Sequence, residues 1–341
     1  LSVTLSDGRS SRDNDNYTID QGPGESRYIR ISDSNSDRGG YDLNLNYDKK
    51  FKNPKHKLTS FLRLSDGNNI GNDEYQNKEW ESFEEFFDNA NAAKNGQDGS
   101  NKSFDFQLDY TRPFESGSKL EFGLSSKTND RNDMQTAEVY DYTLNAFVKD
   151  NEFSNDFNFY ENIHAAYLQY GGSYWFIGYN AGLRYEVVDM LSKLKSNPDE
   201  FKNSYNSLYP SLSFTFGAPQ FAQLQASYSK RVQRPRSRQL NPFISRQDNR
   251  NYRSGNPFLK PEYTDSYELN LSRFSRGLSL SLGTYYRYTT DEITRHKVVN
   301  QDGTSLASYE NIGTKKTKGF EYNIVGSLGK KMRLVFGGNT Y

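Results

Sequence analysis

Arginine side chains gather in one stretch of the sequence, between residues 231 and 253. A guanidinium group donates two parallel hydrogen bonds to a carboxylate or a phosphate, so this group of arginines predicts contact with an anionic ligand. The alternative is a segment folded back on the protein, with its charges neutralised by carboxylates such as Glu262 and Glu268. The ligand-contact candidates in this stretch are Arg234, Arg236, Arg238, Arg246 and Arg250.

A second group of candidates lies in residues 79–94, where aromatic residues recur at helical spacing. Trp80, Phe83 and Phe87 share one face of a helix, while acidic residues cover the rest. The spacing predicts a short amphipathic helix in this region. Trp80 and Phe83 are therefore further ligand-contact candidates, and the alternative is that their rings pack on neighbouring segments.

Catalytic chemistry is not indicated. The chain has 0 cysteines and 3 histidines, and none of the histidines lies near a recognisable motif. A nucleophile, a base and an orienting group do not occur together in the sequence, so no catalytic residue is assigned and no enzyme is expected. Lys+Arg and Asp+Glu are both 43, which argues against a basic nucleic-acid-binding surface. No cofactor is expected.

One acidic stretch has the spacing of a calcium-binding loop. Asp33, Asn35 and Asp37 occupy alternate positions. The sixth position of such a loop needs glycine and the twelfth needs glutamate, but the sequence has Arg38 and Asn44 there. A solvated turn is therefore expected, with a hard cation bound by loop oxygens as the alternative, and no metal-binding residue is assigned.

The elements that position these residues show a period of two. In residues 41–48 the apolar side chains alternate with Asp and Asn, which predicts a strand with one apolar and one polar face. The same alternation recurs along the chain. The side chains predicted to face the apolar surroundings are Leu43, Leu108, Phe122, Leu183, Leu224, Leu269, Leu280 and Ile324. Those predicted to face the opposite side are Asp42, Asp109, Glu121, Arg184, Gln225, Glu268, Arg287 and Glu321.

The connections between strands alternate between short and long. Gly, Pro and Ser mark short turns, which are typical of β-hairpins. Long polar stretches, predicted to be loops, separate the hairpins at roughly 8–40, 66–102, 128–160, 188–207, 233–263 and 291–318. The pattern predicts 13 strands, namely one opening strand and six hairpins, with all the short turns at one end.

These features favour an antiparallel transmembrane β-barrel over a soluble β-domain. The strands reach the length of about 9–11 residues that crosses a bilayer, and tyrosines lie near their ends. Only 33% of residues are hydrophobic, yet 15% are aromatic, which argues against a disordered chain because such chains contain few aromatic residues. Short turns at one end and long connections at the other are typical of outer-membrane barrels, with the turns in the periplasm. The sequence therefore predicts a multi-pass barrel in the outer membrane of a Gram-negative bacterium, in contact with its lipid.

Several motifs support this interpretation. Residues 231–235 read Arg-Val-Gln-Arg-Pro, and residues 255–262 read Gly-Asn-Pro-Phe-Leu-Lys-Pro-Glu. Asn311-Ile312-Gly313 precedes Lys318-Gly319-Phe320-Glu321 further along. Together these residues resemble the barrel portion of TonB-dependent outer-membrane receptors, in the branch described as outer-membrane beta-barrel family proteins.

The resemblance implies a barrel of about 22 strands with a plug inside it. We therefore expect residues 1–341 to be part of one barrel domain, about 13 of those strands, with no plug domain present. Direct closure of 13 strands is disfavoured, because the neighbouring first and last strands would run parallel. We therefore expect an open sheet whose first and last strands do not pair. The native protein is expected to be longer and to contact the TonB complex through a region N-terminal to residue 1.

The function implied by the resemblance is uptake of a specific extracellular nutrient, with the chain forming barrel wall and ligand-capturing loops. A surface lipoprotein is a further expected partner. The arginines have a second expected ligand in this setting, the phosphate of lipopolysaccharide. A plug-free porin and a surface adhesin or structural outer-membrane protein remain alternative functions.

Overall fold

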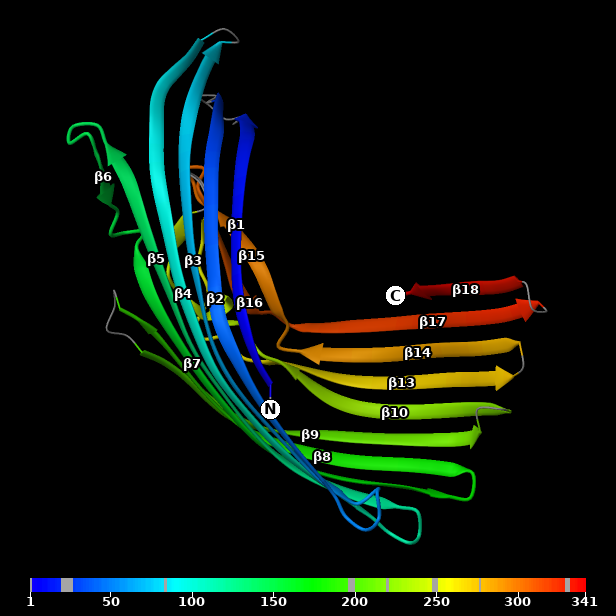
Figure 1. Ribbon diagram of the computed structural model, residues 1–341. Helices are drawn as coiled ribbons and strands as arrows, with labels where there is room; N and C mark the ends of the chain where they lie inside the picture. Colours follow the sequence, from blue (N-terminus) through cyan, green and yellow to red (C-terminus); the bar gives the residue numbers. More distant parts are fainter. Residues whose placement is uncertain are drawn as a thin grey trace.

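The computed structural model describes residues 2–19, 27–82, 85–195, 200–218, 221–246, 251–275, 277–328 and 332–341. Antiparallel strands dominate this part of the chain (Figure 1). Within the described residues no α-helix has the length and apolar character needed to cross a membrane. The all-β architecture predicted from the sequence is confirmed.

A 14-stranded sheet forms the wall of the molecule. Thirteen of its strands follow one another in chain order, and the fourteenth, β6, pairs only with β5. The bounds are β1 (Ser2–Ile19), β2 (Arg27–Lys50), β3 (Lys57–Ser82), β4 (Glu85–Pro113), β5 (Lys119–Asp141), β6 (Ala146–Lys149), β7 (Asn155–Tyr174), β8 (Ile177–Leu194), β9 (Glu200–Ala218), β10 (Ala222–Gln233), β13 (Glu262–Ser275), β14 (Leu278–Thr290), β17 (Thr314–Leu328) and β18 (Met332–Thr340).

The sheet is curved and open. Figure 1 shows β1 to β5 rising along one side and the wall strands β8, β9, β10, β13, β14, β17 and β18 running across the other, with the wall bending between them. The two ends of the strand order are β1 and β18, and no ladder joins them within the described residues. The predicted run of 13 consecutive antiparallel strands with unpaired edges is confirmed.

A second, four-stranded sheet lies within the connections between the wall strands. It comprises β11 (Ser245–Arg246), β12 (Asn251–Arg253), β16 (Ser305–Asn311) and β15 (Ile293–Val299), in that order. The β12–β16 pair is parallel, so a connection after β10 is joined to one after β14. Two distant parts of the chain are thereby fixed to each other.

The short turns lie at one edge of the wall, as the sequence predicts (Figure 1). In the turn between β4 and β5, the backbone N–H of Phe114 donates to the carbonyl of Ser118 at 2.8 Å. Gly117 in this turn has φ +81°, a conformation in which a side chain is strained. The local turn chemistry therefore determines where these hairpins reverse.

The prediction that the long polar stretches form loops is largely wrong. Strands β3 and β4 have 26 and 29 residues, and β2 has 24, so the polar stretches 8–40 and 66–102 mostly continue the ladders. A bilayer needs only about 9–11 residues of strand. These hairpins therefore extend well beyond the membrane as sheet, in water, where polar side chains are suited to both faces.

The predicted helix over residues 79–94 is also wrong. Residues up to Ser82 belong to β3, residues from Glu85 belong to β4, and Trp80 pairs with Phe86 in the register. Phe83 lies outside the described residues. Pairing of β4 with β3 over this stretch overrides the local helical periodicity, because tertiary context outweighs propensity.

The two faces of the wall separate apolar from polar side chains. Leu43 lies opposite Leu64, which lies opposite Phe104, whereas Asp42 on the other face binds Arg63 at 2.7 Å. The same alternation holds across the register for all sixteen residues assigned to faces from the sequence. We call the apolar side the outer face and the polar side the inner face.

The calcium-like spacing falls on an extended strand. Asp33, Asn35 and Asp37 all belong to β2 and pair with residues of β1 and β3. Among the described residues, no group of three His, Cys, Asp or Glu side chains is placed to hold a metal ion.

Candidate functional site

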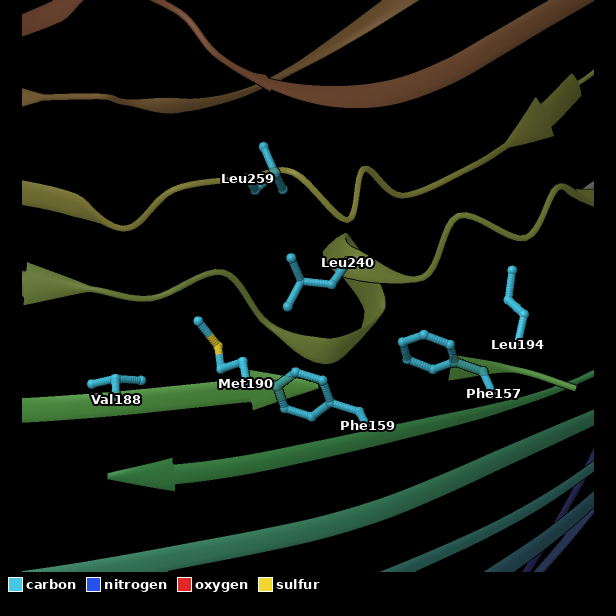
Figure 2. Close-up of a cluster of buried hydrophobic side chains, with 7 residues drawn as sticks. All are labelled: Phe157, Phe159, Val188, Met190, Leu194, Leu240 and Leu259. Carbon is cyan, nitrogen blue, oxygen red and sulfur yellow. The ribbon is translucent and has the colours of Figure 1, made fainter. Parts of the chain in front are cut away.

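The segment between β10 and β13, residues 234–261, folds onto the inner face of the wall in its described parts, 234–246 and 251–261. Leu240 and Leu259 are 2% and 0% exposed. They pack on a cluster of buried side chains from β7 and β8 (Figure 2). Because these leucines are removed from water, their burial holds the segment against the inner face of the wall. The other members of the cluster are Phe157, Phe159, Val188, Met190 and Leu194.

The Gly-Asn-Pro motif gives this segment its shape. The backbone N–H of Gly255 donates to the carbonyl of Asn241 at 2.7 Å, and that of Asn256 donates to the carbonyl of Gln239 at 2.7 Å. A Cβ atom at Gly255 would lie 2.5 Å from both of these carbonyl oxygens, so only glycine fits. The motif therefore closes the segment on itself just after the short helix α1 (Ser237–Leu240).

The second motif is joined to the first. The Asn311 side chain accepts a hydrogen bond from the backbone N–H of Lys260 at 2.8 Å and donates to the Lys260 carbonyl at 3.0 Å. Asn256 donates to the carbonyl of Tyr309 at 3.0 Å. The residues that carry the sequence resemblance thus hold two connections together, and they form a scaffold for the arginines beside them.

Arg234 belongs to a buried ionic network. Glu186, whose side chain is 7% exposed, accepts hydrogen bonds from Arg184 at 2.6 Å and from Arg234. Burial lowers the pKa of the Arg234 guanidinium, but the electrostatic influence of Tyr205 and Glu186 outweighs it, so the pKa is raised. Arg234 is therefore committed to a partner inside the protein.

The carboxylates suggested by the sequence as partners of these arginines have other roles. Glu262 accepts the backbone N–H of Ile293 at 2.7 Å. Glu268 lies 3.9 Å from Arg287 on the neighbouring strand. The suggestion that these two carboxylates neutralise the arginine segment is wrong, because β13 directs them to other groups.

Three arginines of this group, Arg238, Arg246 and Arg253, border a polar cavity of about 360 Å³ on the inner face. All three belong to the 234–261 segment: Arg238 to α1, Arg246 to β11 and Arg253 to β12. Arg131 and Asp133, two residues apart on β5, approach it from the wall. Asp73 of β3 also lines it.

The charges of the cavity are unequally compensated. Arg131 and Asp133 form a two-point ion pair, with distances of 2.7 and 2.9 Å. The guanidinium of Arg246 lies 4.7 Å from the Phe153 ring centroid, and that of Arg253 lies 5.6 Å from the Tyr309 ring. No ion pair within the described residues involves Arg238, Arg246 or Arg253. Four guanidinium groups and two carboxylates give the cavity a positive surplus suited to an anion.

The structure brings together only some of the candidates. Arg238 and Arg246 line the cavity, Arg234 lies in the Glu186 network, and Arg236 is exposed outside the lining. Arg250 and Phe83 lie outside the described residues, and the backbone of Trp80 belongs to β3. Sequence reasoning missed Arg131 and Asp133, because residues 128–160 were expected to be a loop.

Comparison with known proteins agrees with the architecture. The solved copper transporter OprC has a TM-score of 0.57 and 11% identity, over 98% of this chain and 56% of that chain. The FrpB iron transporter from Neisseria meningitidis has a TM-score of 0.51 and 10% identity, over 99% of this chain and 62% of that one. This chain thus spans between about half and two thirds of their lengths, and the likeness is one of fold.

Family membership comes from the sequence itself. No curated protein sequence matches the chain. Residues 49–341 match the family described as "Outer membrane protein beta-barrel family". This range includes most of the wall strands, the second sheet and the arginine-rich segment. The chain belongs to the outer membrane protein beta-barrel family, and it is an outer-membrane β-barrel protein of a Gram-negative bacterium.

Proposed function

We propose that the protein is a TonB-dependent outer-membrane receptor that takes up a specific extracellular nutrient, and that the arginine-lined cavity binds an acidic group of that nutrient. The observation that supports this proposal is the cavity itself. It lies on the inner face, and three of its arginines form no ion pair within the described residues. A solute entering the barrel mouth would meet these groups before it reaches the lower lumen.

The anchoring of the 234–261 segment supports a receptor over an open pore. Leu240 and Leu259 hold the described part of the segment against the wall, which holds Arg238, Arg246 and Arg253 in position. Fixed guanidinium groups favour selective binding, because little side-chain and backbone freedom remains to be lost. The likeness of the fold to a copper transporter and an iron transporter also supports uptake.

The test is retention of a small molecule by the purified protein. Native mass spectrometry of protein extracted from its own cells should show a bound acidic molecule. The double variant Arg238→Ala/Arg246→Ala should lose it, because both side chains line the cavity. The matched control Arg236→Ala should retain it, because this arginine is exposed outside the lining.

Three further measurements separate the alternatives. Uptake of the retained molecule by whole cells should stop when TonB is deleted, because energy is proposed to arrive through the TonB complex. A steady ionic conductance of the full protein in a planar bilayer would contradict the receptor and favour a porin. Loss of surface attachment in the double variant, without loss of uptake, would favour an adhesin.

A further inference from the structure

A row of tyrosines on the outer face ends at a lysine. Tyr228 of β10, Tyr267 of β13, Tyr286 of β14 and Lys318 of β17 lie opposite one another in consecutive ladders. The ring centroids of the first pair are 5.1 Å apart and those of the second 6.3 Å. Lys318 Nζ lies 5.8 Å from the Tyr286 centroid. The row is thus one aromatic strip with a cation at its end.

A second lysine lies in the next row toward the extracellular side. Lys316 lies opposite Tyr288, which lies opposite Asp265. Asp265 accepts the Tyr228 hydroxyl at 2.7 Å and has Lys230 opposite it in the register. These two rows of the outer face therefore carry three lysines, Lys230, Lys316 and Lys318, and one carboxylate, Asp265.

Lys316 and Lys318 differ from the lysine on the inner face of the same strand. Lys315 forms an ion pair with Glu292 at 3.0 Å. Within the described residues, Lys316 and Lys318 take part in ring contacts but in no ion pair. Two ammonium groups two residues apart, on one face of one strand, are thus available to an external anion.

Below the tyrosine row the outer face is hollowed. A shallow groove of about 850 Å³ is lined by residues of five neighbouring wall strands, β9, β10, β13, β14 and β17, and these residues include the three tyrosines of the row and both lysines. The small residues Ala226 and Thr284 flank Leu269 in the register, which leaves space between the larger rings. The floor of this groove is apolar and its upper edge is basic.

The height of the lysines fits the outer surface of the bilayer. β17 ends at Leu328 near the short turns, and Lys318 lies ten positions above it. At about 3.3 Å per residue and a tilt of roughly 40°, this separation corresponds to about 25 Å along the membrane normal. That distance is about the height of the apolar band of an outer-membrane barrel.

We propose that this groove binds a phosphate-bearing lipid of the outer leaflet, with the headgroup phosphate between Lys316 and Lys318 and an acyl chain in the apolar groove below. The lysines supply the charge complementary to a phosphate. The tyrosine row places its rings at the interface, between the lipid chains and the headgroup. The inference concerns the lipid-facing side of the wall and does not depend on the proposed uptake function.

The experiment measures binding of two lipid probes to the purified full chain in detergent. The probes are monophosphorylated lipid A and the same lipid with its phosphate removed. The protein should bind the phosphorylated probe more tightly. The variant Lys316→Gln/Lys318→Gln should lose roughly thirtyfold in affinity for it, because each lysine near an anionic surface contributes about a factor of five.

The matched control removes the same charge at the opposite rim. Lys49 lies 5.2 Å from the Phe51 ring at the short-turn end, and Lys55 lies in that turn. The variant Lys49→Gln/Lys55→Gln should bind the phosphorylated probe as the unmodified protein does. Heat-modifiable migration on gels confirms that both double variants fold.

Three results would overturn the proposal. The first is equal affinity of the unmodified protein and Lys316→Gln/Lys318→Gln for the phosphorylated lipid. The second is equal affinity of the unmodified protein for the two probes. The third is displacement of the lipid by an equal concentration of inorganic phosphate, which would assign the lysines to free phosphate instead of a lipid.

Discussion

The inner and outer faces of the same wall use charge in different ways. On the inner face, Arg63 pairs with Asp42 and Arg184 pairs with Glu186. On the outer face, apolar side chains such as Leu269, 44% exposed, occupy the corresponding strands. The lesson is that one alternating sequence suits two surroundings, because charged side chains on the inner face pair with one another and apolar side chains on the outer face meet lipid.

The largest expected effect is on the inner face. Replacement of Glu186 by alanine leaves Arg234 with an unpaired buried charge. We expect a loss of about 3 kcal/mol in the free energy of unfolding. Urea unfolding of the protein in lipid vesicles measures it. The control Glu200→Ala removes a partner of the exposed Lys193 and should change little. Equal losses for the two variants would contradict a special role of the Glu186 network.

A charge on the outer face should cost nearly as much. Leu269→Arg places a guanidinium in lipid, and we expect a loss of roughly 2–4 kcal/mol if the site lies near the bilayer midplane. Gln225→Arg is the matched control, because Gln225 lies on the inner face of the adjacent strand β10, opposite Asn270. Folding yield into vesicles and urea unfolding check both variants. A greater loss for Gln225→Arg would reverse the assignment of the two faces.

The anchor of the inner segment should have a moderate effect. Leu259 is 0% exposed in the cluster on β7 and β8. Leu259→Ala should cost about 2 kcal/mol through the lost contacts and the cavity left behind, and it should expose the 234–261 segment to protease. Limited proteolysis measures this exposure. Ile244→Ala, at a side chain 47% exposed, should leave the cleavage rate unchanged.

The smallest effect is expected where the wall extends into water. Lys94 and Glu74 form an ion pair at 3.1 Å on the extracellular part of β3 and β4. Glu74→Ala should reduce stability by less than about 1 kcal/mol, because exposed ion pairs contribute little. The same urea titration measures it. A loss above about 2 kcal/mol would show that this extension is packed against something other than water.

The sequence predicted the membrane-height strands because lipid imposes a strict alternation of side chains. In residues 41–48, the repeated alternation of apolar side chains such as Leu43 with polar ones such as Asp42 is enough to assign the two faces. Above the membrane that constraint disappears, since water accepts polar side chains on both faces. The extracellular continuation of β2 to β5 therefore resembles loop sequence, and the pairing that makes it sheet is visible only in the register.

The candidate site was predictable only in part for a related reason. Arg238 and Arg246 are close in sequence, so their grouping could be seen. Arg131 and Asp133 reach the same cavity from β5, about a hundred residues earlier, and no local signal joins them. The position of Arg234 beside Glu186 likewise depends on how the segment folds onto β8.

The most direct test of the account is the sidedness of the wall in cells. The chain has 0 cysteines, so a single introduced thiol reports one position. Thr143→Cys lies in the exposed turn beyond β5, and Glu115→Cys lies in the short turn between β4 and β5. A membrane-impermeant maleimide should label Thr143→Cys on intact cells and Glu115→Cys only after the outer membrane is opened. Labelling of Glu115→Cys on intact cells, with Thr143→Cys protected, would contradict the orientation on which the cavity, the segment and the lipid groove are interpreted.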